Sequence, residues 1–131
     1  MKKSPHAGLT GELTFVVEPK HAIEFADDAM PAVLATPILI GLMERTARQT
    51  LTPLLDAHER SVGTEIDLRH LAPSPVGATV TLTTRVIRAD GREVTFQVEA
   101  RDREEMIARG LHKRAIIRVE SFARRIAAKR G

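Results

Sequence analysis

A single long helix is the feature that most constrains the fold of this chain. The stretch from Leu34 to Leu55 has apolar residues at helical spacing, and its Thr36-Pro37 pair suits a helix N-terminus. Successive steps of about 100° place Glu44 on the same arc as Ala47 and Leu51. Because an unpaired buried carboxylate is costly, we expect Glu44 to have a partner, a shifted pKa or a cavity to face.

Beyond this helix the apolar residues change to the two-residue period of strands. In the segment 61–70 one face carries Val62, Thr64, Ile66, Leu68 and His70, and the other carries Glu65, Asp67 and Arg69. A histidine is therefore expected on the apolar face of this strand, shortly before a turn rich in Pro and Gly.

A hairpin and a longer strand are predicted next. Alternating segments at 79–88 and 94–100 flank the Asp90-Gly91 pair, which is typical of a tight turn between antiparallel strands. After a polar break, the segment 106–120 is predicted to be a long strand, with one apolar phase formed by Ile107, Leu111, Ala115, Ile117 and Val119.

The N-terminal third has weaker patterns. Residues 1–11 are expected to be a loose lead-in, and the run from Leu13 to Pro19 has the composition of a strand. The segment 21–35 has helical patches that are interrupted by Pro31 and two aspartates. We interpret it as a short helix and a loop, and therefore as a candidate lid.

The C-terminal segment 121–131 is predicted to be a short basic helix with Phe122 and Ile126 facing inward. One long helix and five strands indicate an α+β fold, in which a five-stranded antiparallel sheet wraps around one central helix. That arrangement is the hot-dog fold. No linker or repeat divides residues 1–131, so we expect a single domain, and its open sheet edges predict self-association.

Composition argues against several kinds of function. The excess of basic residues, 20 against 17 acidic ones, lies in the last 14 residues, and the chain has four Phe but no Trp or Tyr for stacking on bases. We therefore expect no nucleic-acid partner. The lack of cysteine favours a reducing compartment, and no stretch has the ~20 apolar residues of a membrane span, so a cytoplasmic location is expected. The histidines lack metal-ligand spacing, so no metal site is predicted.

Two residues that can do chemistry lie on faces expected to be apolar: Glu44 and His70. Together they can form an acid/base pair. Each also has a structural explanation, because Glu44 can pair with Arg48 one turn on, and a lone histidine is often a satisfied core residue. Thr36 is a third candidate or simply an N-cap. Since eight helical residues span about 12 Å, Thr36 and Glu44 can share one imidazole only through a folded-back lid or a second subunit.

Several motifs resemble one known family. They are ATPILIGLMERTAR, VGTEIDLRHLAPSPVG, DGREVTFQVEARD and GLHKRAII, and in this order and at these separations they resemble the hot-dog thioesterases related to fluoroacetyl-CoA thioesterase. The resemblance extends from about Leu13 to Phe122. It implies that Thr36, Glu44 and His70 form the catalytic set, and that Gly63 contributes its backbone to the pocket. Further substrate-binding neighbours that it suggests are Met30, Gly110, His112 and Arg114.

The implied function is hydrolysis of a small or medium acyl-CoA thioester by a homodimer, without a metal or redox cofactor. Asp27 and Met30 stand near positions where the fluoroacetate-specific member has lid phenylalanines, so the lid does not predict a fluoroacetyl preference. Two alternatives use the same fold: a non-catalytic module that binds acyl-CoA or a small hydrophobic ligand, and a dehydratase. The basic stretch Arg118 to Arg130 is a candidate contact for CoA phosphates.

Overall fold

The computed structural model of the chain describes residues 1–130. Within this range the order of elements is β1 (Thr10–Val16), α1 (Thr36–Leu51), β2 (Glu59–His70), β3 (Thr79–Asp90), β4 (Glu93–Arg101), β5 (Met106–Arg118) and α2 (Val119–Arg130), with 3₁₀ turns at Pro19–His21 and Thr52–Leu54.

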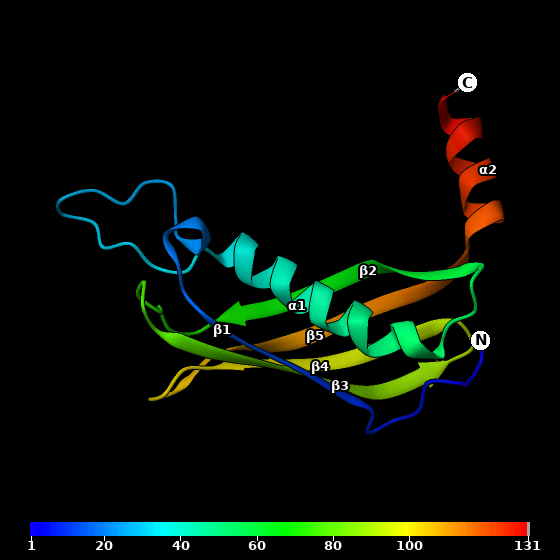
Figure 1. The fold of residues 1–131 in the computed structure, drawn as a ribbon, viewed down its shortest axis with the longest axis horizontal. Helices are drawn as coiled ribbons and strands as arrows, with labels where there is room; N and C mark the ends of the chain where they lie inside the picture. Colours follow the sequence, from blue (N-terminus) through cyan, green and yellow to red (C-terminus); the bar gives the residue numbers. More distant parts are fainter. Residues whose placement is uncertain (131) are drawn as a thin grey trace.

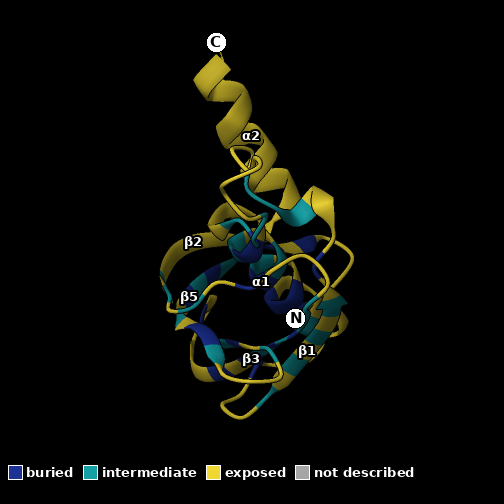
Figure 2. Cartoon of the chain, turned by 90° about the vertical axis from the view of Figure 1, so that its left-hand side faces the viewer, coloured by how far each residue is buried: buried dark blue, intermediate teal, exposed yellow. Residues whose placement is uncertain are grey.

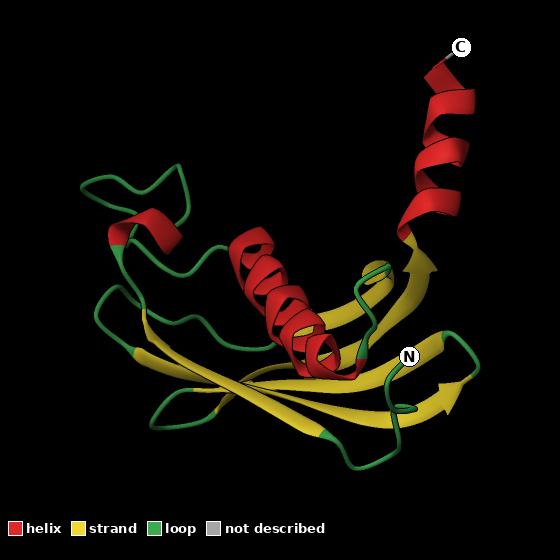
Figure 3. Ribbon diagram, turned by 45° about the vertical axis from the view of Figure 1, so that its right-hand side comes forward, coloured by secondary structure: helices red, strands yellow, loops and turns green. Residues whose placement is uncertain are grey.

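The strands form one antiparallel sheet in the order β1-β3-β4-β5-β2, and α1 packs across one face of it (Figures 1 and 3). The predicted α+β arrangement is confirmed. β3 and β4 turn at Gly91, whose φ of 61° lies in the left-handed region that glycine tolerates. β1 and β2 are the two edges of the sheet, so the outer edge of β2 has no strand beside it within residues 1–130.

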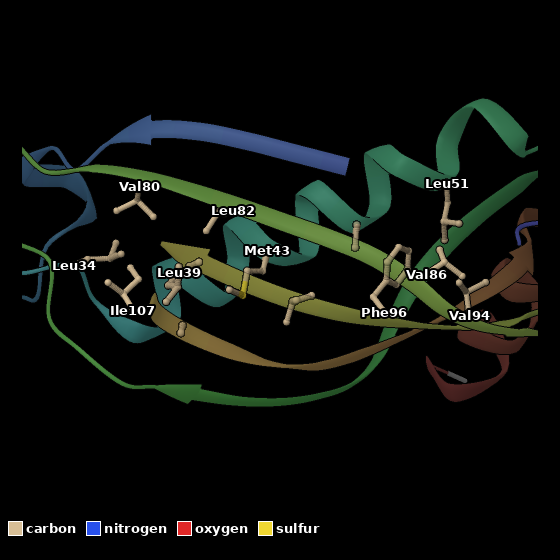
Figure 4. Packing of buried hydrophobic residues seen from close by; sticks show 14 of the residues in the cluster. Leu34, Leu39, Met43, Leu51, Val80, Leu82, Val86, Val94, Phe96 and Ile107 are labelled. Atoms are coloured by element: carbon tan, nitrogen blue, oxygen red, sulfur yellow. The ribbon is translucent and has the colours of Figure 1, made fainter. Parts of the chain in front are cut away.

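The core lies between α1 and the sheet, where Met43 lies near Leu82, and Leu51 lies near Val86 and Phe96 (Figure 4). The buried stripe of α1 consists of Leu39, Met43, Thr46, Ala47 and Leu51. Glu44 lies beside this stripe, with 43% of its side chain exposed. The prediction that Glu44 shares the buried face is therefore wrong, because the buried stripe is centred on Met43 and Ala47 and Glu44 lies at its margin.

A β-bulge in β2 changes which residues face α1. Gly63 and Glu65 oppose consecutive residues of β5, so Thr64 is the extra residue. Because one extra residue moves the later side chains to the opposite face, Val62 and His70 lie on different faces of the sheet. The prediction that they share a face is wrong, whereas the inward orientation of His70 is confirmed.

The face of β5 towards α1 carries His112, Arg114 and Ile116, all of them buried. Leu111 is 41% exposed on the opposite face. The predicted apolar phase containing Leu111 and Ala115 is therefore not the buried one. Two polar residues occupy buried positions there because they bond to each other and to β2, which a hydrophobicity pattern does not detect.

Residues 22–35 form an irregular hairpin between β1 and α1, which we call the lid. Its base closes where Ala22 bridges to Leu34. Its tip is ordered by Asp27, whose Oδ1 accepts hydrogen bonds from the backbone N–H groups of Ala29 and Met30 at 2.9 and 2.7 Å. The predicted short helix is only the single 3₁₀ turn that precedes the lid.

α2 projects from the sheet on the side occupied by α1 and the lid (Figures 1 and 2). Its base is held by a 2.9 Å hydrogen bond from the Val119 N–H to the His58 carbonyl. Phe122 and Ile126 are 39% and 37% exposed, so the prediction that they face inward is wrong. No α2 residue among those described is buried. Gly131, which belongs to the predicted helix, lies outside the described residues.

Candidate active site

The first residue of α1 contacts the last residue of β2. Ala35 is the N-cap of α1 and makes no side-chain capping bond, so Thr36 is not the N-cap. Its hydroxyl is instead used in tertiary structure: Thr36 Oγ1 lies 2.7 Å from His70 Nδ1. A hydroxyl within hydrogen-bond reach of an imidazole is the geometry of an activated nucleophile.

The second nitrogen of His70 is buried and unpaired. His70 Nε2 makes no hydrogen bond within residues 1–130. Burial lowers the pKa of His70 below its usual 6.5, and the nearby backbone of Ala72 partly opposes the shift. The imidazole is therefore neutral at pH 7 and can accept a proton. A buried ring nitrogen of this kind is satisfied by a ligand, by an ordered water or by a group from another chain.

Thr36 and His70 border an open cleft of about 330 Å³, which lies against the base of the lid. The rest of its lining is apolar: Ile23, Val33, Leu34, Leu71, Ala72 and Pro73. An apolar cleft with a few convergent polar groups is typical of a small-molecule site.

Glu44 lies farther along α1, above the bulge in β2. A Cβ at Gly63 would collide with Glu44 Oε2 and would lie 3.3 Å from His112 Cε1, so only glycine leaves room for the carboxylate. Glu44 Oε2 is 3.7 Å from Arg114 Nη1, and this ion pair replaces the pairing with Arg48 that the sequence allowed. Glu44 is therefore held by β2 and β5.

His112 and Arg114 form a buried network beneath Glu44. Arg114 donates from Nε to Ser61 Oγ at 2.9 Å and from Nη2 to the Ser61 carbonyl at 2.8 Å. His112 Nδ1 donates to the Glu65 carbonyl at 2.8 Å, which leaves Nε2 to accept from Arg114 Nη1 at 3.2 Å. These partners define a neutral tautomer. Burial lowers the pKa of His112, in agreement with that state.

The structure therefore divides the predicted site into two groups. Thr36 and His70 meet at one end of α1, whereas Glu44 and Gly63 meet near its middle. Gly63 and His70 are seven residues apart on β2, or roughly 23 Å at about 3.3 Å per residue. The lid does not fold back to close this gap, so one chain does not assemble the whole set.

Other predicted neighbours have different positions. Met30 lies at the lid tip and is not among the residues that line the cleft. A Cβ at Gly110 would collide with the backbone of Asp67, so this glycine allows close approach of two strands. Ser61 was missed by the sequence reasoning, because only the bulge brings it to the inner face. Among residues 1–130 no group of three or more metal-ligating side chains occurs, and no helix has the length and apolarity to cross a membrane.

Residues 17–120 match the sequence model of the family described as fluoroacetyl-CoA-specific thioesterase. The chain belongs to this family. It is also 34% identical over 137 residues to the fluoroacetyl-CoA thioesterase of Streptantibioticus cattleyicolor, with 98% of this chain and 97% of that protein covered. The predictions of an acyl-CoA thioester hydrolase and of the family relationship are therefore confirmed.

Solved structures support the same conclusion. A structure of the fluoroacetyl-CoA thioesterase has a TM-score of 0.87 at 32% identity, with 97% of this chain and 98% of that chain covered. A hot-dog-like protein from Thermanaerovibrio acidaminovorans has a TM-score of 0.88 at 24% identity, covering 95% and 93%, which bears on the fold alone. The predicted hot-dog fold is confirmed.

Proposed function

We propose that this thioesterase hydrolyses a small acyl-CoA thioester at a site shared by two subunits of a homodimer. The observation that carries the proposal is the 2.7 Å contact between Thr36 and His70 at an apolar cleft, with His70 Nε2 buried and unpaired. In the proposed dimer, Glu44 of the partner subunit supplies the acceptor for His70 Nε2.

The free edge of β2 supports this assembly. An exposed 12-residue edge strand is a ready template for pairing, and a two-fold axis through its middle joins two copies of β2 antiparallel. With the axis near Glu65, His70 of one subunit lies beside residue 60 of the other. It is then about three residues, or roughly 10 Å, from Gly63 of that other subunit, over which the Glu44 carboxylate lies. Within one chain, His70 and Gly63 are roughly 23 Å apart, which is more than twice as far.

The proposed roles follow the logic of a hydroxyl, imidazole and carboxylate triad. Thr36 donates its proton to His70 Nδ1, and His70 Nε2–H donates to Glu44 of the partner subunit. The carboxylate fixes the tautomer and stabilises the imidazolium that forms. Arg114, Ser61 and Gly63 position Glu44 without contacting the substrate.

The reaction balances in two steps. Thr36 Oγ1 attacks the thioester carbonyl carbon as its proton passes to His70, the C–S bond breaks, and the CoA thiolate leaves with that proton. Water then attacks the acyl ester, His70 accepts a proton from the water, and the carboxylic acid leaves as Thr36 regains its proton. The N–H groups in the first turn of α1 lie near the developing oxyanion and favour it.

The apolar lining of the cleft supports a short aliphatic acyl group. A relative that is 34% identical was solved with fluoroacetate and CoA, with a TM-score of 0.82, and 90% of this chain covered. CoA is accordingly proposed as the carrier here. The lid of this chain has Phe25 68% exposed and Asp27 in its tip, so the proposal does not extend to fluoroacetyl specificity.

Release of free CoA from acetyl, fluoroacetyl, propionyl, butyryl, isobutyryl and benzoyl-CoA tests the proposal. We expect turnover with at least one short-chain ester and its loss in His70→Ala. Background rates with every ester, or unchanged turnover in His70→Ala, would refute it.

A further inference from the structure

We propose that α2 of each subunit docks against the lid of the partner subunit and covers the partner's acyl cleft. The inference rests on the dimer proposed above and goes beyond it, because it gives a function to a helix that has no buried residue. Within the described residues, α2 bonds to the rest of its own chain only at its base, where Val119 and Glu120 contact His58. The occupant of the exposed face of α2 is a second copy of this chain.

α2 has two sides of different chemistry. At 100° per residue, Val119, Phe122 and Ile126 form one apolar stripe, and their exposed fractions are 38%, 39% and 37%. Arg125 and Lys129 flank this stripe, whereas Arg124 lies on the opposite side of the helix. A stripe of large apolar side chains on a projecting helix is costly in water and is typical of a binding surface.

The lid has the complementary chemistry. Phe25 is 68% exposed and Met30 is 37% exposed. Glu24, Asp27 and Asp28 are acidic and exposed, and no ion pair involves them among residues 1–130. Backbone hydrogen bonds to Asp27 lower the pKa of its carboxyl, which keeps the lid tip negative. The lid therefore presents apolar side chains among negative charges, and the stripe of α2 presents apolar side chains among positive charges.

Topology brings the two surfaces together only across a dimer. In one subunit α2 follows β5 and begins beside the start of β2, whereas the lid lies at the other end of β2 (Figure 1). The 12 residues of β2 span about 35–40 Å at about 3.3 Å per residue. Antiparallel pairing of β2 with its copy places the start of one strand beside the end of the other. A two-fold axis perpendicular to the sheet keeps both projections on the same face, the face of α1 (Figures 1 and 3).

The docking would link the two active sites, because α2 of each subunit would pack on the lid over the partner's cleft. The base of the lid lines the cleft through Ile23, Val33 and Leu34. A helix packed on the outside of the lid holds it against Thr36 and His70 and reduces access of water to the acyl group.

Cross-linking tests the contact between the lid and α2 of the partner. The sequence has no cysteine, so a thiol-specific reagent reacts only with introduced cysteines. The double variant Ala29→Cys/Ala123→Cys has one thiol on the lid and one on the stripe side of α2. We expect a short bis-maleimide to give covalent dimers with this pair. The matched control is Ala29→Cys/Ser121→Cys, whose α2 thiol has a similar height on the opposite side of the helix and should give few. Equal yields, or dimers from Ala123→Cys alone, would overturn the proposal.

A charge-reversal cycle adds a functional readout. We expect Arg125→Glu to raise KM about two- to fivefold, the range of an exposed charge pair, and Asp28→Lys added to it to restore KM. Arg124→Glu is the matched control and should leave KM unchanged. A rise in KM that Asp28→Lys fails to reverse would assign Arg125 to CoA phosphates and overturn docking to the lid.

Light scattering separates this proposal from the one on which it rests. A monomer would refute the shared active site and α2 docking together. An active dimer without the lid-to-α2 cross-link would refute docking alone.

Discussion

The hydroxyl of Thr36 lies 2.7 Å from Nδ1 of His70, although 34 positions separate the two residues in sequence. The contact exists because α1 begins where β2 ends, so the hydroxyl that sequence rules assign to helix capping is available for chemistry. The neutral imidazole beside it can accept the hydroxyl proton. Thr36 and His70 are thus in contact within one chain, whereas Glu44 of the same chain lies near the middle of α1, beside Gly63.

Removing either member of the pair should reduce turnover. We expect Thr36→Ala and His70→Ala each to lower kcat about 10²–10⁴-fold, the usual contribution of a positioned acid/base group. Thr36→Ser keeps the hydroxyl and should stay within about tenfold of wild type. Rapid quenching and mass spectrometry should detect an acyl group on Thr36. If Thr36→Ala retained turnover while His70→Ala lost it, His70 would activate water directly.

The pH profile should report the lowered pKa of His70. The reaction requires the neutral imidazole, and burial lowers the pKa of His70 below 6.5. More than half of the maximal activity should therefore remain at pH 6.5, and activity should fall as the pH decreases through the pKa of His70 below 6.5. The measurement is kcat/KM of the free enzyme against pH. An acidic limb centred above 6.5 would contradict the dominance of burial and would show that a carboxylate beside His70 Nε2 raises its pKa more than burial lowers it.

Gly63→Ala should displace Glu44. The added Cβ collides with the Glu44 carboxylate, so we expect a stability loss of about 1–3 kcal/mol from overpacking and a fall in kcat of about 10- to 100-fold. Gly41→Ala is the matched stability control, because a Cβ there meets no atom within 4 Å. In the helix interior that alanine should stabilise the protein by about 0.5–1 kcal/mol. Equal thermal shifts for the two variants would remove the steric argument.

Arg114→Lys should lower both stability and activity although it keeps the positive charge. Lysine cannot reproduce the two hydrogen bonds to Ser61, and their loss should cost about 1–3 kcal/mol. Arg48→Lys is the control, because Arg48 is exposed and changes at such sites stay within about 0.5 kcal/mol. Chemical denaturation measures both. A larger loss of stability in Arg48→Lys would contradict this prediction and would favour an ion pair between Glu44 and Arg48.

The sequence predicted much of the fold because its signals are local. Helical spacing in α1, alternation in the strands and the Asp90-Gly91 pair each depend on nearby residues. The errors arise where tertiary structure decides. The bulge at Thr64 moved Val62 to the outer face, and the hydrogen-bonded pair His112 and Arg114 took buried positions that apolar residues were expected to fill.

The site was predicted in the same uneven way. His70 was proposed because a polar residue stood on a face expected to be apolar, and Glu44 was proposed by the same reasoning although 43% of its side chain is exposed. The role of Thr36 came from the family resemblance, since locally it looked like a helix cap. Ser61 gave no signal in the sequence.

The central claim, that each active site takes His70 from one subunit and Glu44 from the other, is tested most directly by subunit complementation. Glu44→Gln and His70→Ala homodimers, each inactive alone, are mixed, dissociated and reassociated. A shared site predicts that each mixed dimer contains one intact site, so random exchange restores about one quarter of wild-type activity. If every site lies within one subunit, both sites of the mixed dimer carry a mutation, and activity that stays at background would contradict the account.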